Sequence, residues 1–175
     1  VTDLRLGFYG DDFTGSTDAL EALATAGWRT VLFVAPPTDE QLARFGGLEV
    51  VGVAGRTRAL AAAKMADELR PVFARFAALG CRIVHYKTCS TFDSSPQVGS
   101  VGRAIDIGQE IFASPFVPLV VGAPALQRFC AFGNLFARSG LDSEVFRLDR
   151  HPTMREHPIT PMDEADLRVH LGRQT

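Results

Sequence analysis

Short apolar segments alternate with amphipathic segments over residues 4–121, and this rhythm limits the fold more than any other feature of the sequence. The valine-rich segment 49–54 has the continuous apolar character of a strand that is buried on both faces. Strands that helices join in this way pair in parallel, with right-handed crossovers. The sequence therefore predicts an α/β fold with a mainly parallel sheet flanked by helices, in a Rossmann-like three-layer arrangement. Strands are predicted at 4–9, 30–34, 49–54, 82–87 and 118–121, and helices at 16–26, 39–44, 60–79 and 101–112.

Two further features refine this prediction. Apolar residues at spacings of three and four, including Met65 and Leu69, give the helix at 60–79 one apolar stripe. Pro71 lies inside that helix, and its missing N–H predicts a kink or a break near Arg70. Beyond residue 122 the alternation ends, and the predicted elements are short extra strands at 129–132 and 145–148 and a terminal helix at 163–171.

Charge and cysteine content exclude several classes of protein. The chain has 18 Lys and Arg against 20 Asp and Glu, a net charge of −2, and no basic run, so no nucleic acid is expected as a partner. The longest apolar stretch, 111–126, is interrupted by prolines and is shorter than the about 20 residues of a membrane helix, so no membrane is expected either. Three cysteines without a CxxC pair, and no secretory signal, predict reduced thiols and a cytoplasmic location.

Two adjacent carboxylates, Asp11 and Asp12, follow the first predicted strand. Ligands of an open parallel sheet bind beyond the carboxyl ends of the strands, where the next helix also presents free N–H groups and partial positive charge. Adjacent carboxylates are costly there unless a cation or a hydroxyl group interacts with them. We therefore expect both aspartates, with Thr14 and Gly15, to belong to a site, although Asp12 and Thr14 also suit simple capping of the helix.

Two further loops are predicted to meet the first at the same edge of the sheet. Arg56 and Arg58 follow the third strand, and guanidinium groups bind carboxylates or phosphates, although each would also suit a solvated charge pair. The loop at 87–96 carries one lysine, one aspartate and five hydroxyl groups, which suits a polyhydroxylated or anionic small molecule. The candidate binding residues in these loops, in the following helix and in a later polar cluster at 148–152 are Arg56, Lys87, Ser90, Thr91, Asp93, Ser94, Arg103 and His151.

Several chemistries lack their sequence signature. The chain has no phosphate loop of the P-loop NTPases, no dinucleotide-binding glycine pattern and no nucleophile elbow of the serine hydrolases. His151 and His157 do not have a zinc-ligand spacing, and no metal site is expected in this chain. An aspartyl phosphatase would require Asp-x-Asp where this chain has two consecutive aspartates, so that activity is kept only as an outside alternative.

Five segments resemble the signatures of one enzyme family. They are 9–18 (YGDDFTGSTD), 86–96 (YKTCSTFDSSP), 132–137 (FGNLFA), 149–154 (DRHPTM) and 160–167 (TPMDEADL). In this order they resemble the N-terminal, sugar-binding part of the four-carbon acid sugar kinases. The long block at 87–94 is most similar to the 3-oxo-tetronate kinase branch.

The resemblance implies a two-domain enzyme. Its N-terminal domain, to which residues 1–175 would correspond, binds the sugar acid, and a C-terminal domain absent from this chain binds ATP with Mg²⁺. The implied reaction is ATP-dependent phosphorylation of the terminal hydroxyl of a four-carbon acid such as 3-oxo-tetronate, erythronate or threonate. The chain by itself is then expected to be inactive. The surface that meets the C-terminal domain is expected to be partly apolar and to favour a homo-oligomer.

The resemblance and the polar loops agree on the roles of the candidates. Asp11 or Asp12 is expected to orient the terminal hydroxyl, as the catalytic base. The cations Arg56, Lys87 and Arg103 are expected to bind the carboxylate, and Ser90, Thr91 and Asp93 are expected to bind hydroxyl groups together with the two aspartates. A stand-alone, non-catalytic sugar-acid-binding domain is the alternative function.

Overall fold

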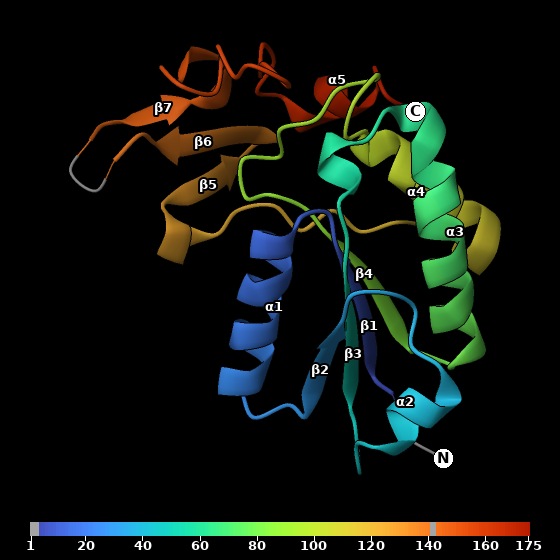
Figure 1. Ribbon diagram of the computed structural model, residues 1–175. Helices are drawn as coiled ribbons and strands as arrows, with labels where there is room; N and C mark the ends of the chain where they lie inside the picture. The colour runs from blue at the N-terminus through green and yellow to red at the C-terminus, as the bar shows by residue number, and fades with distance from the viewer. Residues whose placement is uncertain (1–3, 141–142) are drawn as a thin grey trace.

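The computed structural model describes residues 4–140 and 143–175, and these residues form two β-sheets. The larger sheet is parallel, with strand order β2-β3-β1-β4. Figure 1 shows α1 on one side of this sheet, and α3 and α4 packed together on the other. The predicted fold class is confirmed. The elements of this part are β1 (Leu6–Gly10), α1 (Phe13–Thr25), β2 (Thr30–Phe33), α2 (Asp39–Ala43), β3 (Val50–Ala54), α3 (Ala62–Ala78), β4 (Ile83–Lys87) and α4 (Val101–Phe112).

The main core lies between the parallel sheet and α3 and α4. All five residues of β3 are buried, as its valine-rich sequence predicts. The apolar stripe of α3 includes Met65, Leu69 and Phe76, which are fully buried against the sheet. α3 runs through Pro71 as one helix with its buried stripe on both sides of the proline, so of the predicted kink or break near Arg70 the break is wrong.

Two helix starts are set by capping side chains. α1 begins at Phe13 rather than at residue 16, because the side chain of Asp12 accepts a hydrogen bond from the N–H of Gly15 (2.6 Å). α2 begins after Thr38, whose hydroxyl accepts from the N–H of Gln41 (3.2 Å) in a capping box.

The strand predicted at 118–121 is wrong. Residues 116–122 belong to neither of the two described sheets, and Val120 is 93% exposed. Pro115 and Pro118 each lack the N–H that a ladder needs, so β-branched residues do not suffice to make this segment a strand. β4 is therefore an edge strand of the sheet, and its Ile83 is largely exposed.

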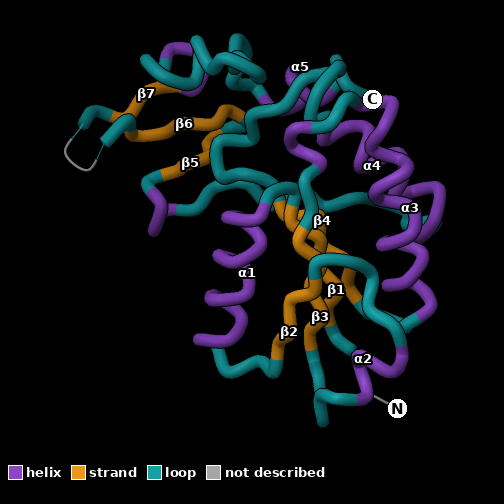
Figure 2. The backbone as a smooth tube through the Cα atoms, viewed as in Figure 1, coloured by secondary structure: helices purple, strands orange, loops and turns teal. Residues whose placement is uncertain are grey.

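A small antiparallel sheet, order β5-β6-β7, lies beyond the parallel one (Figure 2). The sequence predicts its outer strands but not β6, which it treats as a connection. The predicted terminal helix is shorter than expected, because Asp166 caps it by accepting from the N–H of Arg168 (3.0 Å). The elements of this part are η2 (Pro124–Leu126), β5 (Arg128–Ala131), β6 (Asn134–Arg138), β7 (Val145–Arg147), η3 (Leu148–Arg150) and α5 (Leu167–Leu171). None of the helices in the described residues combines the length and apolar character needed to cross a bilayer.

Candidate functional site

Three neighbouring strands of the parallel sheet end level with one another. Gly10 of β1 pairs with Ala54 of β3 and with Lys87 of β4. The N–H of Asp11 donates to the carbonyl of Lys87 (2.9 Å), and the carbonyl of Asp11 accepts from the N–H of Arg58 (3.1 Å). The loops after β1, β3 and β4 therefore meet at one edge, which is where the sequence predicts the site.

Two tyrosines support the loop after β3, which includes the short helix η1 (Thr57–Ala59). Tyr9 and Tyr86 stack with ring centroids 5.8 Å apart. The Tyr9 hydroxyl accepts from the N–H of Arg56 (3.3 Å), and the Tyr86 hydroxyl bonds Thr57 (2.8 Å). Burial raises the pKa of Tyr9 to about 12, so this hydroxyl stays neutral and serves the hydrogen bond. Gly55 has no room for a side chain, because a Cβ would lie 1.9 Å from the Tyr9 ring.

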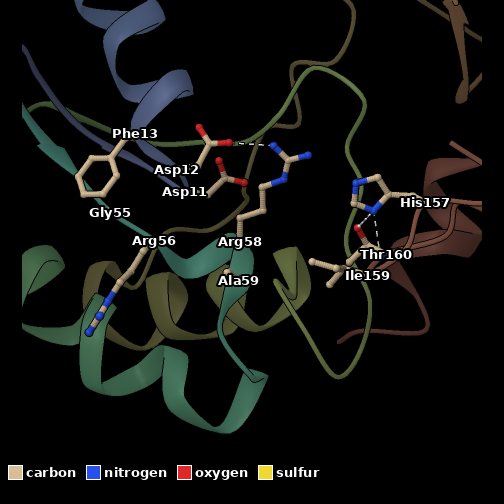
Figure 3. Close-up of a pocket in the computed structure, with 10 residues that line it drawn as sticks. All are labelled: Asp11, Asp12, Phe13, Gly55, Arg56, Arg58, Ala59, His157, Ile159 and Thr160. Carbon is tan, nitrogen blue, oxygen red and sulfur yellow. Dashed lines mark hydrogen bonds and ion pairs between the residues drawn. The ribbon is translucent and has the colours of Figure 1, made fainter. Parts of the chain in front are cut away.

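A cavity of about 300 Å³ opens at this edge of the sheet (Figure 3). One wall comes from the loops after β1 and β3, and the other from the segment 155–161, far away in the sequence. The volume lies at the small end of the range for small-molecule sites. The lining residues are Asp11, Asp12, Phe13, Gly55, Arg56, Arg58, Ala59, His157, Ile159 and Thr160.

Arg58 joins two carboxylates at the floor of the cavity. Its Nη1 donates to Asp12 Oδ2 (2.8 Å) and its Nη2 to Asp93 Oδ2 (2.7 Å). Burial by itself would raise the pKa of Asp93, but the hydrogen bond from Thr91 (2.6 Å) and the charge and hydrogen bond of Arg58 outweigh it, and the pKa is lowered. Asp93 is therefore a buried anion that depends on Arg58 for its compensation.

The two adjacent aspartates have different surroundings. Asp12 is hydrogen-bonded by Arg58 and by the N–H of Gly15, whereas Asp11 Oδ1 is buried and has no hydrogen-bond partner among the described residues. Burial, followed by the charge of Asp12, raises the pKa of Asp11 to about 7, although Arg58 and Lys87 act in the opposite direction. A carboxylate with such a pKa at a cavity suits proton exchange with a hydroxyl group near neutral pH.

Lys87 and Gly15 lie beside these aspartates, as the sequence predicts. A Cβ on Gly15 would lie 3.2 Å from Lys87 Nζ and 3.0 Å from Asp12 Oδ1. Lys87 Nζ donates to the carbonyl of Thr88 (2.9 Å), which leaves two of its three protons for other acceptors. The absence of a side chain at Gly15 thus lets a cation approach the start of α1.

Other predicted binding residues lie at the margin of the cavity or behind it. Arg56 lines it, but the guanidinium points away from Asp11 and Arg58 (Figure 3) and pairs with Glu68 (3.5 Å). Thr14 is exposed on the first turn of α1, and Ser90 is half-buried in the loop after β4. Thr91 and Asp93 act from behind the floor, through Arg58.

The structure does not bring Ser94, Arg103 or His151 to the cavity. Ser94 is buried and bonds His170 Nε2 (2.9 Å), which ties the loop after β4 to α5. Arg103 lies in the first turn of α4, where its N–H donates to Ser100. His151 is buried, and its Nδ1 accepts from the N–H groups of the two residues that follow Pro152, each at 3.2 Å. The side chains of Ser94 and His151 therefore hold loops, whereas the contact of Arg103 is that of its backbone N–H with the cap of α4.

The sequence does not mark every residue of the cavity. It places Arg56 and Arg58 in one candidate loop, but nothing in it indicates that Arg58 is the arginine between two carboxylates. His157, Ile159 and Thr160 follow no predicted strand, so the rule about strand ends does not reach them. Thr160 alone lies in a family signature, at 160–167. Within the described residues, no group of three or more His, Cys, Asp or Glu is arranged to hold a metal ion.

Comparisons with known proteins agree with the residue motifs. The sequence profile of the sugar-binding N-terminal domain matches residues 6–175. The chain belongs to this family. It is 59% identical over 172 residues to a 3-oxo-isoapionate kinase of Paraburkholderia graminis, and 34% identical over 170 residues to a 3-oxo-tetronate kinase of Pseudomonas fluorescens. The alignments cover 98% and 97% of this sugar-binding domain but only 36% and 37% of the two kinases, so the chain spans little more than a third of their length.

Solved structures show the same fold. A Salmonella typhimurium protein superposes with a TM-score of 0.86 at 29% identity, over 98% of the sugar-binding domain and 38% of that chain. A domain of unknown function from Bordetella bronchiseptica, solved with bound citrate as a domain-swapped dimer, superposes with a TM-score of 0.75 at 26% identity, over 96% of this chain and 39% of that one. The resemblance to the N-terminal domain of sugar-acid kinases is confirmed.

Proposed function

We propose that this domain is the substrate-binding part of an ATP-dependent kinase that phosphorylates the terminal hydroxyl of a 3-oxo sugar acid. The proposal rests on the surroundings of Asp11. This residue is a buried carboxylate at the cavity of a sugar-binding domain, one of its oxygens has no partner among the described residues, and its pKa is raised to about 7. Its neighbour Asp12 is already engaged by Arg58 and by the start of α1.

The cavity offers a complementary group for each part of such a substrate. Asp11 takes the proton of the terminal hydroxyl, and Asp12 is a positioning residue that holds Arg58. Lys87 is a second cation beside this pair, after Arg58, and it neutralises the substrate carboxylate. Phosphoryl transfer depends mainly on positioning and on neutralisation of charge, which is what fixed carboxylates and a cation provide.

ATP and Mg²⁺ are assigned to the remainder of the kinase rather than to these residues. When bound, ATP supplies the phosphoryl group. The described residues hold no cluster of metal ligands. Exposed apolar side chains at Phe116, Val117 and Val120 support a contact surface for a C-terminal nucleotide-binding domain. The domain-swapped dimer of the Bordetella relative supports self-association as the other use of such a surface.

The identities favour one substrate over the other. The sugar-binding domain is 59% identical to the 3-oxo-isoapionate kinase but 34% identical to the 3-oxo-tetronate kinase, and both comparisons cover nearly all of it. We therefore propose 3-oxo-isoapionate as the preferred ligand. 3-Oxo-tetronate, erythronate and threonate are the competing acids.

Isothermal titration calorimetry of the 175-residue chain tests the proposal. The chain is titrated with 3-oxo-isoapionate, 3-oxo-tetronate, D-erythronate and L-threonate, and separately with ATP and Mg²⁺. Binding of an acid without binding of ATP is the expected result, and the tightest acid names the substrate. Binding of ATP alone would make the polar loops a nucleotide site and overturn the proposal.

A stand-alone binding domain and a phosphatase are distinguished by turnover of the whole protein that contains this chain. A kinase consumes ATP only when the sugar acid is present, and Asp11→Asn is expected to lower its kcat at least about 100-fold. An Asp12→Asn variant that loses more kcat than Asp11→Asn would show that the base has been assigned to the wrong aspartate. Phosphate release from an ester without ATP would favour a phosphatase.

A further inference from the structure

The second wall of the cavity is a loop whose two ends are joined by a backbone hydrogen bond. The N–H of Met162 donates to the carbonyl of Met154 (2.9 Å), and the side chains of both methionines are buried. This bond closes the segment 155–161 at its base. His157, Ile159 and Thr160 are the residues of this segment that line the cavity.

Thr160 fixes one nitrogen of the His157 ring. The N–H of Thr160 donates to His157 Nδ1 (3.1 Å), and the Thr160 hydroxyl lies 3.0 Å from the same nitrogen. That hydroxyl also donates to Asp93 Oδ2 (3.1 Å), which ties the histidine to the charged floor. Because a backbone N–H can only donate, Nδ1 must accept. The neutral imidazole therefore carries its proton on Nε2.

The second ring nitrogen is a donor directed toward the cavity. The hydrogen bonds of His157 in the described part of the chain use Nδ1, and Figure 3 shows Nε2 on the side of the ring that faces Arg58. The terminal nitrogens of Arg58 already donate to Asp12 and Asp93. His157 thus adds a neutral N–H donor to the wall, next to the apolar side chain of Ile159.

We infer that His157 Nε2–H donates a hydrogen bond to the 3-oxo oxygen of the bound sugar acid and so determines the preference for a 3-oxo over a 3-hydroxy acid. This inference rests on the proposed function. The substrate carboxylate, being charged, is better matched to the ammonium group of Lys87, which lies beside Gly15 and the two aspartates. The terminal hydroxyl donates to Asp11. The oxo oxygen can only accept, and a fixed neutral donor is the group that matches it.

Two substitutions separate the donor from the structural role of the ring. In His157→Asn, the side-chain oxygen takes the place of Nδ1 and accepts from Thr160, but the Nε2–H donor is lost. In His157→Gln, the amide nitrogen reaches the place of Nε2 and restores a donor there. Calorimetry of the 175-residue chain compares both variants with wild type on 3-oxo-isoapionate, 3-oxo-tetronate and L-threonate.

The expected result is a loss confined to the 3-oxo acids. His157→Asn should bind the preferred 3-oxo acid about tenfold more weakly, as expected for one lost hydrogen bond, and should bind L-threonate as wild type does. His157→Gln should recover most of the loss. If wild type binds no sugar acid, the proposed function fails. If wild type binds a 3-oxo acid and His157→Asn binds it equally well, or loses affinity equally for L-threonate, the role of His157 is wrong.

A spectroscopic measurement on the wild-type chain does not depend on the folding of a variant. Two-dimensional NMR of ¹⁵N-labelled imidazole rings reports which nitrogen carries the proton, and His157→Gln assigns the signal. We expect the Nε2–H tautomer for His157 in the free chain and a shift of its Nε2 resonance when the 3-oxo acid binds. A proton on Nδ1, or an Nε2 signal unmoved by a bound 3-oxo acid, would overturn the inference.

Discussion

The two walls of the cavity are built in different ways. The wall formed by the loops after β1 and β3 is fixed by the register of a buried parallel sheet, and it holds the charged groups. The segment 155–161 belongs to no strand, and it lines the cavity with His157, Ile159 and Thr160. Its link to the first wall is the bond from the Thr160 hydroxyl to Asp93, the buried anion that Arg58 compensates. The charges of the first wall therefore have two tasks, one toward a ligand and one in holding the second wall in place.

Removal of Arg58 is expected to have the largest effect, because it breaks the connection between the walls. Arg58→Met leaves Asp93 buried without its cation, and loss of one partner of a buried pair costs about 3–5 kcal/mol. Since Arg58 is itself partly exposed, we expect a loss near the lower end, about 3 kcal/mol in the free energy of unfolding. Urea denaturation measures this loss, and the chain should also bind its sugar acid more weakly.

Arg56→Met is the matched control for Arg58→Met. Arg56 lies two residues away and also pairs with a carboxylate, Glu68, but its side chain is 71% exposed. Exposed pairs contribute little, so its loss should change stability by about 0.5 kcal/mol or less. Equal losses in the two variants would show that the bridge between Asp12 and Asp93 has no special weight.

Asp11 makes the first wall sensitive to pH. Its pKa is about 7 in the folded chain against an ordinary value of 3.8. Between these values the unfolded chain has lost the proton and the folded chain retains it, so the free energy of unfolding falls as pH rises. At about 1.4 kcal/mol per pH unit, Asp11 should remove about 2–3 kcal/mol between pH 5 and pH 7. Urea denaturation at both pH values should show a smaller fall for Asp11→Asn than for wild type, and parallel falls would contradict the raised pKa.

The sequence predicts the first wall better than the second for a physical reason. The carboxyl ends of parallel strands lie at the same edge of a sheet, so polar residues after Gly10, Ala54 and Lys87 are expected close together. No such rule places residues 155–161, whose position depends on hydrogen bonds between side chains such as Thr160 and Asp93. The predicted fifth strand failed for a different reason, because its β-branched residues suit a strand but Pro118 lacks the N–H that a ladder needs.

Local secondary structure was predictable where a few residues close in the sequence determine it. The helix at 39–44, which the structure shows as α2, and the buried stripe of α3 were both predicted from the sequence. The role of Arg58 was not, because an arginine in a loop has many accessible partners and only the fold selects two of them. β6 was missed because its pattern is short and because its buried residues, Leu135 and Ala137, pack in one cluster with residues of α5, which is distant in the sequence.

Gly15→Ala tests whether the first wall needs open space beside its charges. Alanine should gain up to about 1 kcal/mol of helix propensity, but its Cβ would lie 3.0 Å from Asp12 Oδ1 and 3.2 Å from Lys87 Nζ. We expect a net change in stability within about 1 kcal/mol, together with severalfold weaker binding of the sugar acid as Lys87 is displaced. Calorimetry and urea denaturation measure the two effects.

Gly108→Ala is the control for this substitution. Gly108 lies inside α4, and its new Cβ would make only an ordinary contact, 3.8 Å from Phe73. It should gain about 0.5–1 kcal/mol without a change in binding. If Gly15→Ala behaves in the same way, the space at the start of α1 has no role in the site.

Phe132→Asn addresses the sheet beside the second wall and is expected to have the smallest effect. Phe132 and Gly133 form the two-residue turn between β5 and β6, and both have positive φ, +52° and +81°. Phe132 is 96% exposed, so it has little packing to lose, and asparagine tolerates this conformation far better. Thermal and urea denaturation should show a gain of about 0.5–1 kcal/mol in the free energy of unfolding.

Gly133→Ala is the opposite control, because it adds a Cβ at positive φ only 3.2 Å from Arg168, and it should lower the free energy of unfolding by about 1 kcal/mol. A loss of stability in Phe132→Asn would mean that the exposed ring stabilises the fold. A gain with unchanged binding of the sugar acid would show that this region, unlike the charged wall, retains a strained residue that neither its stability nor the cavity requires.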